Sequence, residues 1–443
     1  MPIPFALTWP RGDGYWKCRA RFAAHDAPDG FETENPDEER MILHRGPFAI
    51  LAALVLAMPS AALADFNADP PNAIDQSPAF AGQTRAPVMP QAMRLIRTVL
   101  TEDLRHPWGM ALLPDGGLLI SERPGQLRLY RDGRLSPPIK GLPEVDARDQ
   151  GGLLDVAVAP NFAETRQVWF SFSEPRGNGE NGTAVGTGRL SQDETALEEM
   201  RVIFHQQPGV ESPLHFGSRL VLGSDGYLYV TTGERAIPPE TPVAQDLTNH
   251  LGKVLRLDPA TGEAAPGNPL AGGDAQPEIW TYGHRNIQAA ALDGQGRLWT
   301  VEHGPMGGDE LNLLEPGRNY GWPVISYGLN YDGTRAGQGQ TRHEGMEQPV
   351  YYWDPVIAPS GMAFYEGAMF PEWRGDALIG GLQAGALVRL RIEGDRVTGE
   401  QRLAPDIGRV RDVEIAPDGA VLVLIDDDPG KLIRLTRRGA LPQ

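Results

Sequence analysis

The chain has 443 residues with a formal net charge of −18, and 22% of its residues are charged. Such an acidic surplus disfavours nucleic acid and anionic membrane as partners, because both would repel it. Cys18 is the only cysteine, which excludes a disulfide framework and a C-x-x-C-H haem-attachment motif.

Residues 1–40 are polar and charged and show no hydrophobic periodicity. At Met41 a different pattern begins, with a short basic start, an apolar run and small residues that end at Ala64. The apolar run is too short to span a bilayer. We therefore interpret residues 41–64 as a cleaved signal peptide and residues 1–40 as an upstream extension of the gene model. The alternative is a buried apolar segment after a disordered tail. We expect a periplasmic or secreted protein without stable membrane insertion.

Residues 65–93 are rich in Pro, Ala, Asn and Gln, which indicates an N-terminal arm or linker. From residue 94 to residue 443 a pattern of apolar strand, turn and apolar strand recurs six times, and most copies are followed by further strands. The copies begin roughly 45 to 75 residues apart, a spacing typical of propeller blades with loop insertions. The sequence therefore predicts an all-β fold, a six-bladed β-propeller of four-stranded antiparallel blades. A pair of β-sandwiches is the alternative. The copies begin at Met110, Leu154, Leu220, Ala289, Met362 and Val413.

Function in a propeller lies at one end of the central channel, where loops from several blades converge. Polar side chains precede or open four of the expected innermost strands, and we expect them to face one axial site. They are Gln150, His215, Arg285, Asn286, Arg409 and Arg411.

Each of these residues has a structural alternative. A lone histidine such as His215 more often caps or braces a strand. Arg285 and Asn286 are equally consistent with hydrogen bonds between blades. Arg409 and Arg411 alternate along one strand and so point to one face, where they form either a solvated stripe or an anion clamp.

The stretch from Trp280 to Pro323 is the densest in polar chemistry. Its Asp309-Glu310 pair and nearby turn carbonyls offer hard oxygen ligands, which suit calcium. The alternative for the acidic pair is a solvated turn.

Three phrases in this stretch, GHRNIQ, EHGPMGGDELN and GRNYGWP, resemble the glucose/sorbosone dehydrogenase family, and most closely its aldose sugar dehydrogenases. Similar phrases extend from about Leu104 to about Arg434. The resemblance implies an enzyme that oxidises the anomeric carbon of aldose sugars to lactones by hydride transfer to pyrroloquinoline quinone (PQQ). Electrons would pass to an external acceptor, a cytochrome or a quinone, and the protein would be a monomer or a dimer.

The resemblance also implies roles for individual residues. His215 would be the general base, and Arg285 would bind and polarise the quinone. Other residues would hold the cofactor, or would ligate one calcium beside PQQ and a second, structural calcium. The cofactor would be held by Gln150, Asn286, Arg409 and Arg411, the first calcium by the carbonyls of Gly304 and Pro305, and the second by Asp309, Glu310 and Tyr320.

Departures from the glucose dehydrogenase branch favour the aldose sugar dehydrogenase branch. Leu214 stands where that branch has an acid before the histidine, and Gln383 falls where it has a cofactor-binding lysine. Because Leu214 supplies no carboxylate to pair with the imidazole, we expect the activity to fall below a histidine-like apparent pKa. Trp353 is one residue away from a tryptophan that lines the cofactor in relatives. Two other function classes are a calcium-dependent propeller hydrolase or lactonase and a non-catalytic binding propeller. The lactonase needs carboxylates on the axis, whereas we expect the acids to cluster in one loop and His and Arg side chains to line the axis.

Overall fold

The computed structural model describes residues 65–90 and 93–438. The interpretation of residues 1–64 as an upstream extension and a signal peptide lies outside these residues and stays a prediction. Within the described ranges, no helix is both long enough and apolar enough to cross a membrane.

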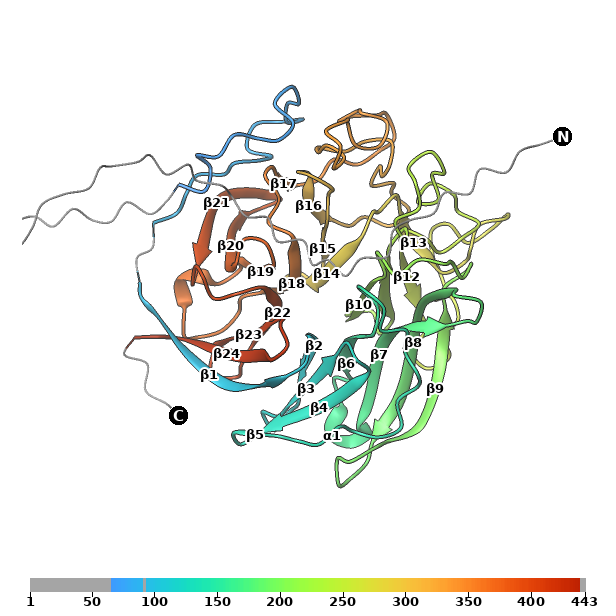
Figure 1. The fold of residues 1–443 in the computed structure, drawn as a ribbon, viewed down its shortest axis with the longest axis vertical. Helices are drawn as coiled ribbons and strands as arrows, with labels where there is room; N and C mark the ends of the chain where they lie inside the picture. Colours follow the sequence, from blue (N-terminus) through green and yellow to red (C-terminus); the bar gives the residue numbers. More distant parts are fainter. Residues whose placement is uncertain (1–64, 91–92, 439–443) are drawn as a thin grey trace, which may run out of the picture. The chain divides into compact units, whose positions relative to one another are not determined.

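The described chain forms six antiparallel sheets of four strands each. The first strands of the sheets, β2, β6, β10, β14, β18 and β22, contact one another in a ring and surround a common centre (Figure 1). This arrangement confirms the predicted six-bladed β-propeller.

The strands of the first three blades are β2 (Pro107–Leu112), β3 (Leu118–Glu122), β4 (Gln126–Arg131) and β5 (Arg134–Leu135); β6 (Leu153–Val158), β7 (Gln167–Pro175), β8 (Asn181–Leu190) and β9 (Leu197–His205); and β10 (Gly217–Leu222), β11 (Leu228–Thr232), β12 (Lys253–Leu257) and β13 (Ile279–Tyr282). Those of the fourth and fifth blades are β14 (Ile287–Leu292), β15 (Leu298–Glu302), β16 (Asp309–Leu313) and β17 (Tyr351–Trp353); and β18 (Pro359–Phe364), β19 (Ala377–Gly381), β20 (Ala386–Glu393) and β21 (Arg396–Leu403). Two short helices, α1 (Phe162–Thr165) and η1 (Pro371–Trp373), lie in connections.

The sixth blade joins the two ends of the propeller. Its inner strands β22 (Val410–Ile415), β23 (Val421–Ile425) and β24 (Gly430–Arg437) come from the end of the described chain. Its outermost strand is β1 (Leu95–Leu104), which pairs antiparallel with β24. Hydrogen bonds between the two ends of the chain thus close the ring.

Glycine turns between the first two strands of a blade set the hairpins. Gly116, Gly226 and Gly419 adopt φ values of +85°, +83° and +85°. An L-residue rarely adopts this left-handed conformation, so an Asp-Gly pair between two apolar runs predicts the turn.

The hydrophobic core consists of layers between neighbouring blades. In one layer Leu119 and Leu127 of the first blade pack against Val168 and Phe170 of the second. Equivalent layers fill the other five gaps. Each such side chain contributes roughly 1.5–3 kcal/mol through burial. Because the apolar layers lie between blades, the central channel is left for polar side chains of the innermost strands.

The N-terminal arm is bound to the propeller along residues 65–90. The Asp354 carboxylate accepts hydrogen bonds from the backbone N–H groups of Asn72 and Ala73, both at 2.9 Å. The Met89 N–H donates to the Glu400 carbonyl of β21 at 2.8 Å. The arm therefore attaches to the fourth and fifth blades.

Candidate active site

The loops that enter the innermost strands meet at one end of the channel, which we call the mouth. The His215 N–H donates to Gln150 Oε1 at 2.9 Å, and the Gly217 N–H donates to Asn286 Oδ1 at 3.2 Å. Arg411 Nη1 donates to Gln288 Oε1 at 3.1 Å. These bonds cross from the second blade to the third, from the third to the fourth, and from the fourth to the sixth. The predicted residues of four blades therefore lie close together.

His215 lies at the mouth in a strained backbone conformation, with φ +49°. Its imidazole is 12% exposed, and Nδ1 lies 2.7 Å from Oε2 of Glu234. The Ala236 N–H donates to the same oxygen at 2.9 Å. Because the carboxylate accepts a hydrogen bond from Nδ1–H, the Nε2 lone pair is available to take a proton from a substrate.

The pKa of His215 lies below its usual range. Burial lowers it most, the Glu234 carboxylate opposes this, and the Arg285 charge lowers it further. The imidazole is therefore uncharged at neutral pH, the state that a general base requires.

Glu234 corrects an inference that we drew from Leu214. The absence of an acid directly before His215 suggested an imidazole without a carboxylate partner. The partner instead comes from the end of the neighbouring strand β11, because the β10–β11 pairing sets Gly217 opposite Thr232. Sequence reasoning missed Glu234, although an acid just beyond the second strand of a blade is a pattern that recurs at Glu302.

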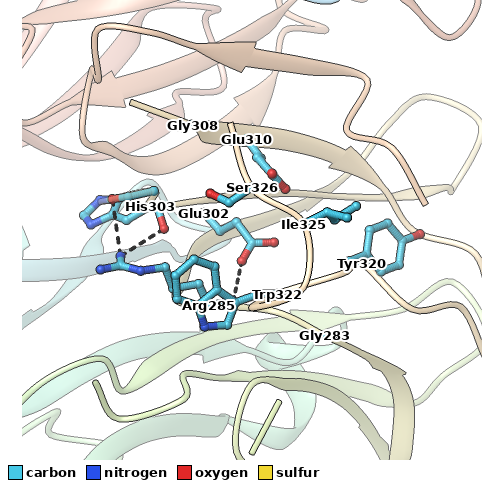
Figure 2. A pocket seen from close by; sticks show the side chains of 11 residues that line it. Gly283, Arg285, Glu302, His303, Gly308, Glu310, Tyr320, Trp322, Ile325 and Ser326 are labelled. Atoms are coloured by element: carbon cyan, nitrogen blue, oxygen red, sulfur yellow. Dashed lines mark hydrogen bonds between the residues drawn. The ribbon is translucent and has the colours of Figure 1, made fainter. Parts of the chain in front are cut away.

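Hydrogen bonds from its backbone N–H and from Nη1 hold Arg285 in place, while its Nε donor is unused within the described residues. Its N–H donates to Oε2 of Glu302 at 2.7 Å, and Nη1 donates to the His303 and Gly304 carbonyls at 3.1 and 3.3 Å. Figure 2 shows the guanidinium beside Trp322, 5.3 Å from the ring centre. Within the described residues, the buried Nε atom has no hydrogen-bond partner. Such a donor is suited to an anionic or carbonyl ligand.

Arg409 and Arg411 share one carboxylate, as their alternation predicts, but their exposure differs. Arg411 is buried and its Nη2 lies 3.0 Å from Asp426 Oδ2, whereas the Arg409 side chain is 56% exposed and lies 3.6 Å from the same oxygen. Burial opposes ionisation of Asp426, but the Arg411 and Arg123 charges outweigh it and hold its pKa well below the usual range. Arg411 thus belongs to the axial site and Arg409 to its solvent rim.

His303 is a second axial histidine that sequence reasoning missed. It is the residue after β15, and its Nε2 lies 2.7 Å from the Pro359 carbonyl. Burial lowers its pKa to about 3, with smaller contributions from the charges of Arg285, Arg411 and His215. His303 is therefore a neutral part of the wall and not a base.

Two glutamates face a small cavity beside Arg285. Glu302 and Glu310 line a cavity of about 10 Å³, with Gly304, Trp322 and Ser326 among the other walls (Figure 2). The volume is about that of one water molecule or one ion. Asn312 Nδ2 donates to both carboxylates at 3.2 Å. Burial raises the pKa of Glu310 well above its usual value, and the Glu302 charge adds to this. A cation there would relieve the repulsion between the two carboxylates.

The geometry does not support a cation shared by the side chains of Asp309, Glu310 and Tyr320. Asp309 and Glu310 lie in strand β16 and not in a solvated turn, so their side chains point to opposite faces. The Asp309 carboxylate accepts three backbone N–H groups, from Gly304, Ile357 and Ala358.

The Tyr320 hydroxyl is also occupied, because it donates to the Leu313 carbonyl and accepts from the Glu315 N–H, both at 2.8 Å. Because its carboxylate accepts the Gly304 N–H, Asp309 instead braces the turn that carries Gly304 and Pro305. Tyr320 retains only its backbone carbonyl as a ligand.

The two residues with open assignments, Trp353 and Gln383, lie in the fourth and fifth blades. Trp353 is buried and donates through Nε1 to Glu400 in the fifth blade, at 3.1 Å. Gln383 is an exposed residue of the turn between β19 and β20.

Carboxylates also line the channel itself, contrary to our expectation that the acids cluster in one loop. Asp155 and Asp412 lie on the axis, with Arg219 Nη1 at 2.9 Å from the first and 3.1 Å from the second. The guanidinium therefore occupies the position that a cation would take between them. In the described part of the chain, no group of three or more His, Cys, Asp or Glu side chains is arranged to hold a metal ion.

The sequence of the propeller matches a known family. The model of the glucose / sorbosone dehydrogenase family matches residues 104–434. The chain belongs to this family. The resemblance of the three phrases between Trp280 and Pro323 is thereby confirmed.

Relatives of known name have the same length and fold as the propeller. Aldose sugar dehydrogenase YliI of Escherichia coli is 44% identical over 346 residues, covering 77% of this chain and 92% of the relative. The solved apo form of the soluble aldose sugar dehydrogenase of Escherichia coli superposes with a TM-score of 0.74 at 43% identity, covering 78% of this chain and 100% of that chain. The PQQ-bound aldose sugar dehydrogenase of Streptomyces coelicolor has a TM-score of 0.64 at 28% identity, covering 78% and 98%.

Proposed function

We propose that the chain is a quinoprotein dehydrogenase that oxidises the anomeric carbon of aldose sugars to lactones, with PQQ as its hydride acceptor. The observation that carries the proposal is the 2.7 Å contact between His215 and Glu234, at a mouth where the buried Arg285 has a free donor. Membership of the family and a relative solved with PQQ bound support it.

The donors of the mouth fit an anionic quinone. PQQ is a tricarboxylic quinone, and when bound it supplies a two-electron acceptor. Arg285 and Arg411 are buried, and the Nε atom of each lacks a partner within the described residues. We propose that these two arginines bind the anionic groups of the cofactor, with Arg409, Gln150 and Asn286 around them.

His215 performs the proton transfer in this proposal. A sugar hydroxyl is a poor hydride donor until its proton is removed, and the free Nε2 atom of a neutral imidazole accepts that proton. The negative charge of Glu234 stabilises the imidazolium that forms. The sugar loses one proton to His215 and one hydride to the quinone, and gains the carbonyl of a lactone.

We propose that calcium binds in the cavity between Glu302 and Glu310. Calcium prefers carboxylate and carbonyl oxygens, and two buried carboxylates that share a cavity need a positive charge between them. Glu302 replaces Asp309 as a ligand in this proposal. The same ion or a second one would be reached by the Gly304 and Pro305 carbonyls, which the Asp309 brace holds in place.

The proposal includes a separate electron acceptor and an extracytoplasmic location. A covalent haem motif needs two cysteines and the chain has one. The signal-peptide pattern of residues 41–64 supports export to the periplasm or beyond.

The test is a titration of the metal-free protein with PQQ and calcium, followed by reduction of a redox dye with a panel of aldoses. We expect saturable PQQ binding and dye reduction that requires both additions, with lactone as product. Sorbitol, which has no anomeric hydroxyl, is the matched control and should give no turnover. The proposal fails if PQQ does not bind or if no aldose reduces the dye. Lactone hydrolysis without PQQ would favour the lactonase alternative.

A further inference from the structure

A second cavity lies on the axis, further along the innermost strands than the mouth. Its volume is about 350 Å³, within the usual range for small-molecule sites. All six blades contribute to it, which places it in the central channel. The lining residues used below are Met110, Leu220, Met362, Arg219 and Glu414. We call this space the lower chamber.

A charged layer separates the lower chamber from the mouth. Arg219 bonds to Asp155 and Asp412, and its Nε donates to the Gln288 carbonyl at 3.2 Å. On the mouth side the guanidinium lies 4.5 Å from the ring centre of the buried Trp108. None of the residues that line the lower chamber is among the catalytic or cofactor-binding residues proposed at the mouth. The lower chamber is thus distinct from the proposed active site.

Two polar groups of the lower chamber have unused hydrogen-bonding capacity. Arg219 is 7% exposed, and its buried Nη2 has no partner in the described chain. The carboxyl of Glu414 has one bond, from the Ile415 N–H at 2.9 Å, which leaves Oε2 free. Asp155 and Asp412, in contrast, each use both oxygens, because backbone N–H groups occupy those that do not contact Arg219. The chamber therefore offers one free carboxyl group, and the Arg219 charge lies buried in its wall.

We propose that the lower chamber binds a small polyhydroxylated molecule, a polyol or a monosaccharide, as a non-catalytic ligand. Hydroxyl groups of such a molecule exchange hydrogen bonds with the Glu414 carboxyl. A simple cation would be repelled by Arg219, and a simple anion by the three nearby carboxyl groups. The apolar walls formed by Met110, Leu220 and Met362 pack against the C–H faces of such a molecule.

The protonation of Glu414 supports the same ligand class. Burial raises the pKa of this carboxyl to about 7, and the charges of Asp412 and Asp155 contribute. Near neutral pH the carboxyl is present in both states, so it accepts from a hydroxyl in one state and donates to it in the other. Neutral hydroxyls are compatible with both states, whereas a charged ligand is compatible with only one.

The experiment uses sorbitol as the probe, with the full-length protein loaded with PQQ and calcium. Binding is followed by saturation-transfer NMR and by isothermal titration. We expect one site per chain with a dissociation constant on the order of millimolar, as is common for ligands of about 12 non-hydrogen atoms. Glu414→Leu should abolish the signal, and Glu414→Gln, which keeps the shape and loses the charge, should weaken binding about 10-fold. Glu393→Gln, an exposed change on β20, is the matched control and should have no effect.

A competition assay separates the chamber from the mouth. If sorbitol occupies the lower chamber, it leaves the KM for an aldose unchanged in the dye assay. The proposal is overturned if binding does not saturate, which would mean that the chamber holds only water. It is also overturned if Glu414→Leu binds sorbitol as the unmodified protein does, or if sorbitol raises the KM. These outcomes do not depend on which aldose is oxidised, and the NMR readout remains valid even if the proposed dehydrogenase activity fails.

Discussion

The contact between His215 and Glu234 gives the sharpest test of the catalytic site. In Glu234→Gln the side chain keeps its length and loses its charge. The His215 Nδ1–H and the Ala236 N–H both converge on Oε2, so the amide oxygen of glutamine satisfies them best. The geometry is therefore retained, and the change removes the negative charge that stabilises the imidazolium and that also lies 3.9 Å from Arg285 Nε.

The size of the effect follows from this contact. A hydrogen bond to a charged group contributes about 1.5–3 kcal/mol, and about 1.4 kcal/mol corresponds to tenfold in rate. Because the charge on His215 develops only during proton transfer, the loss should fall on kcat, by about 10- to 100-fold. The affinity for PQQ should change little, since Arg285 and Arg411 keep their free donors.

The pH dependence separates a catalytic effect from a structural one. The Glu234 charge raises the pKa of His215, against burial and Arg285, which lower it. Its removal lowers that pKa further, so the acid limb of kcat/KM should move to lower pH even though the rate is smaller. In the unmodified protein this limb should already lie below the ordinary histidine pKa of about 6.5. That expectation replaces the histidine-like limb that Leu214 alone suggested.

The matched control is Glu174→Gln. Glu174 Oε2 lies 2.9 Å from Nδ1 of His205, a histidine and carboxylate pair of the same kind, but the His205 side chain is 48% exposed and lies at the end of β9. This variant should turn over normally. The catalytic role of Glu234 is refuted if its variant turns over at the normal rate with an unshifted pH profile, or if PQQ binding is lost together with turnover.

Three further predictions use the same assays. In His215→Asn the asparagine tolerates the positive φ of this position. The variant should bind PQQ yet lose at least about 10²-fold in rate. Near-normal dye reduction would make His215 a structural residue. Glu310→Gln should change the melting temperature in chelator little, since burial and the Glu302 charge favour the uncharged form of the Glu310 carboxyl when no metal is bound. It should abolish the stabilisation by calcium, which is about 2.7 kcal/mol at 100-fold Kd in the unmodified protein, and equal calcium stabilisation of both proteins would contradict the site. Exported protein should begin at Asp65, and N-terminal sequencing that finds residues 1–40 in it would refute the signal-peptide interpretation.

The fold could be predicted because its determinants are local. Four of the six first hairpins have two apolar runs around an Asp-Gly turn, and six copies of a strand–turn–strand unit leave few architectures open. The pairing of β1 with β24 was not predicted, because it depends on contacts between the two ends of the propeller and has no local signal. The docking of the arm on Asp354 was missed for the same reason.

The candidate site could be predicted only where a residue lies directly before or at the start of an innermost strand. His215 and Arg285 lie two residues before such a strand and Arg411 is the second residue of one, and the structure brings all three to the mouth. Glu234 and Glu302 reach the mouth from the second strands of their blades, so their proximity depends on strand register and not on sequence distance. The error at Asp309 has a related cause, because adjacent residues in a strand face opposite sides.

The charges at the mouth have two effects that are linked. The chain as a whole is acidic, yet Arg285, Arg409 and Arg411 gather at its mouth, where their charges can attract an anionic cofactor. The charge of Arg285 also lowers the pKa of His215 and so keeps the base free of its proton before the cofactor binds. A bound anion would partly neutralise that charge and raise the pKa of His215 again. Cofactor binding should therefore make His215 a stronger base at the moment when a sugar is to be deprotonated, while Glu234 is already in place to stabilise the imidazolium that forms.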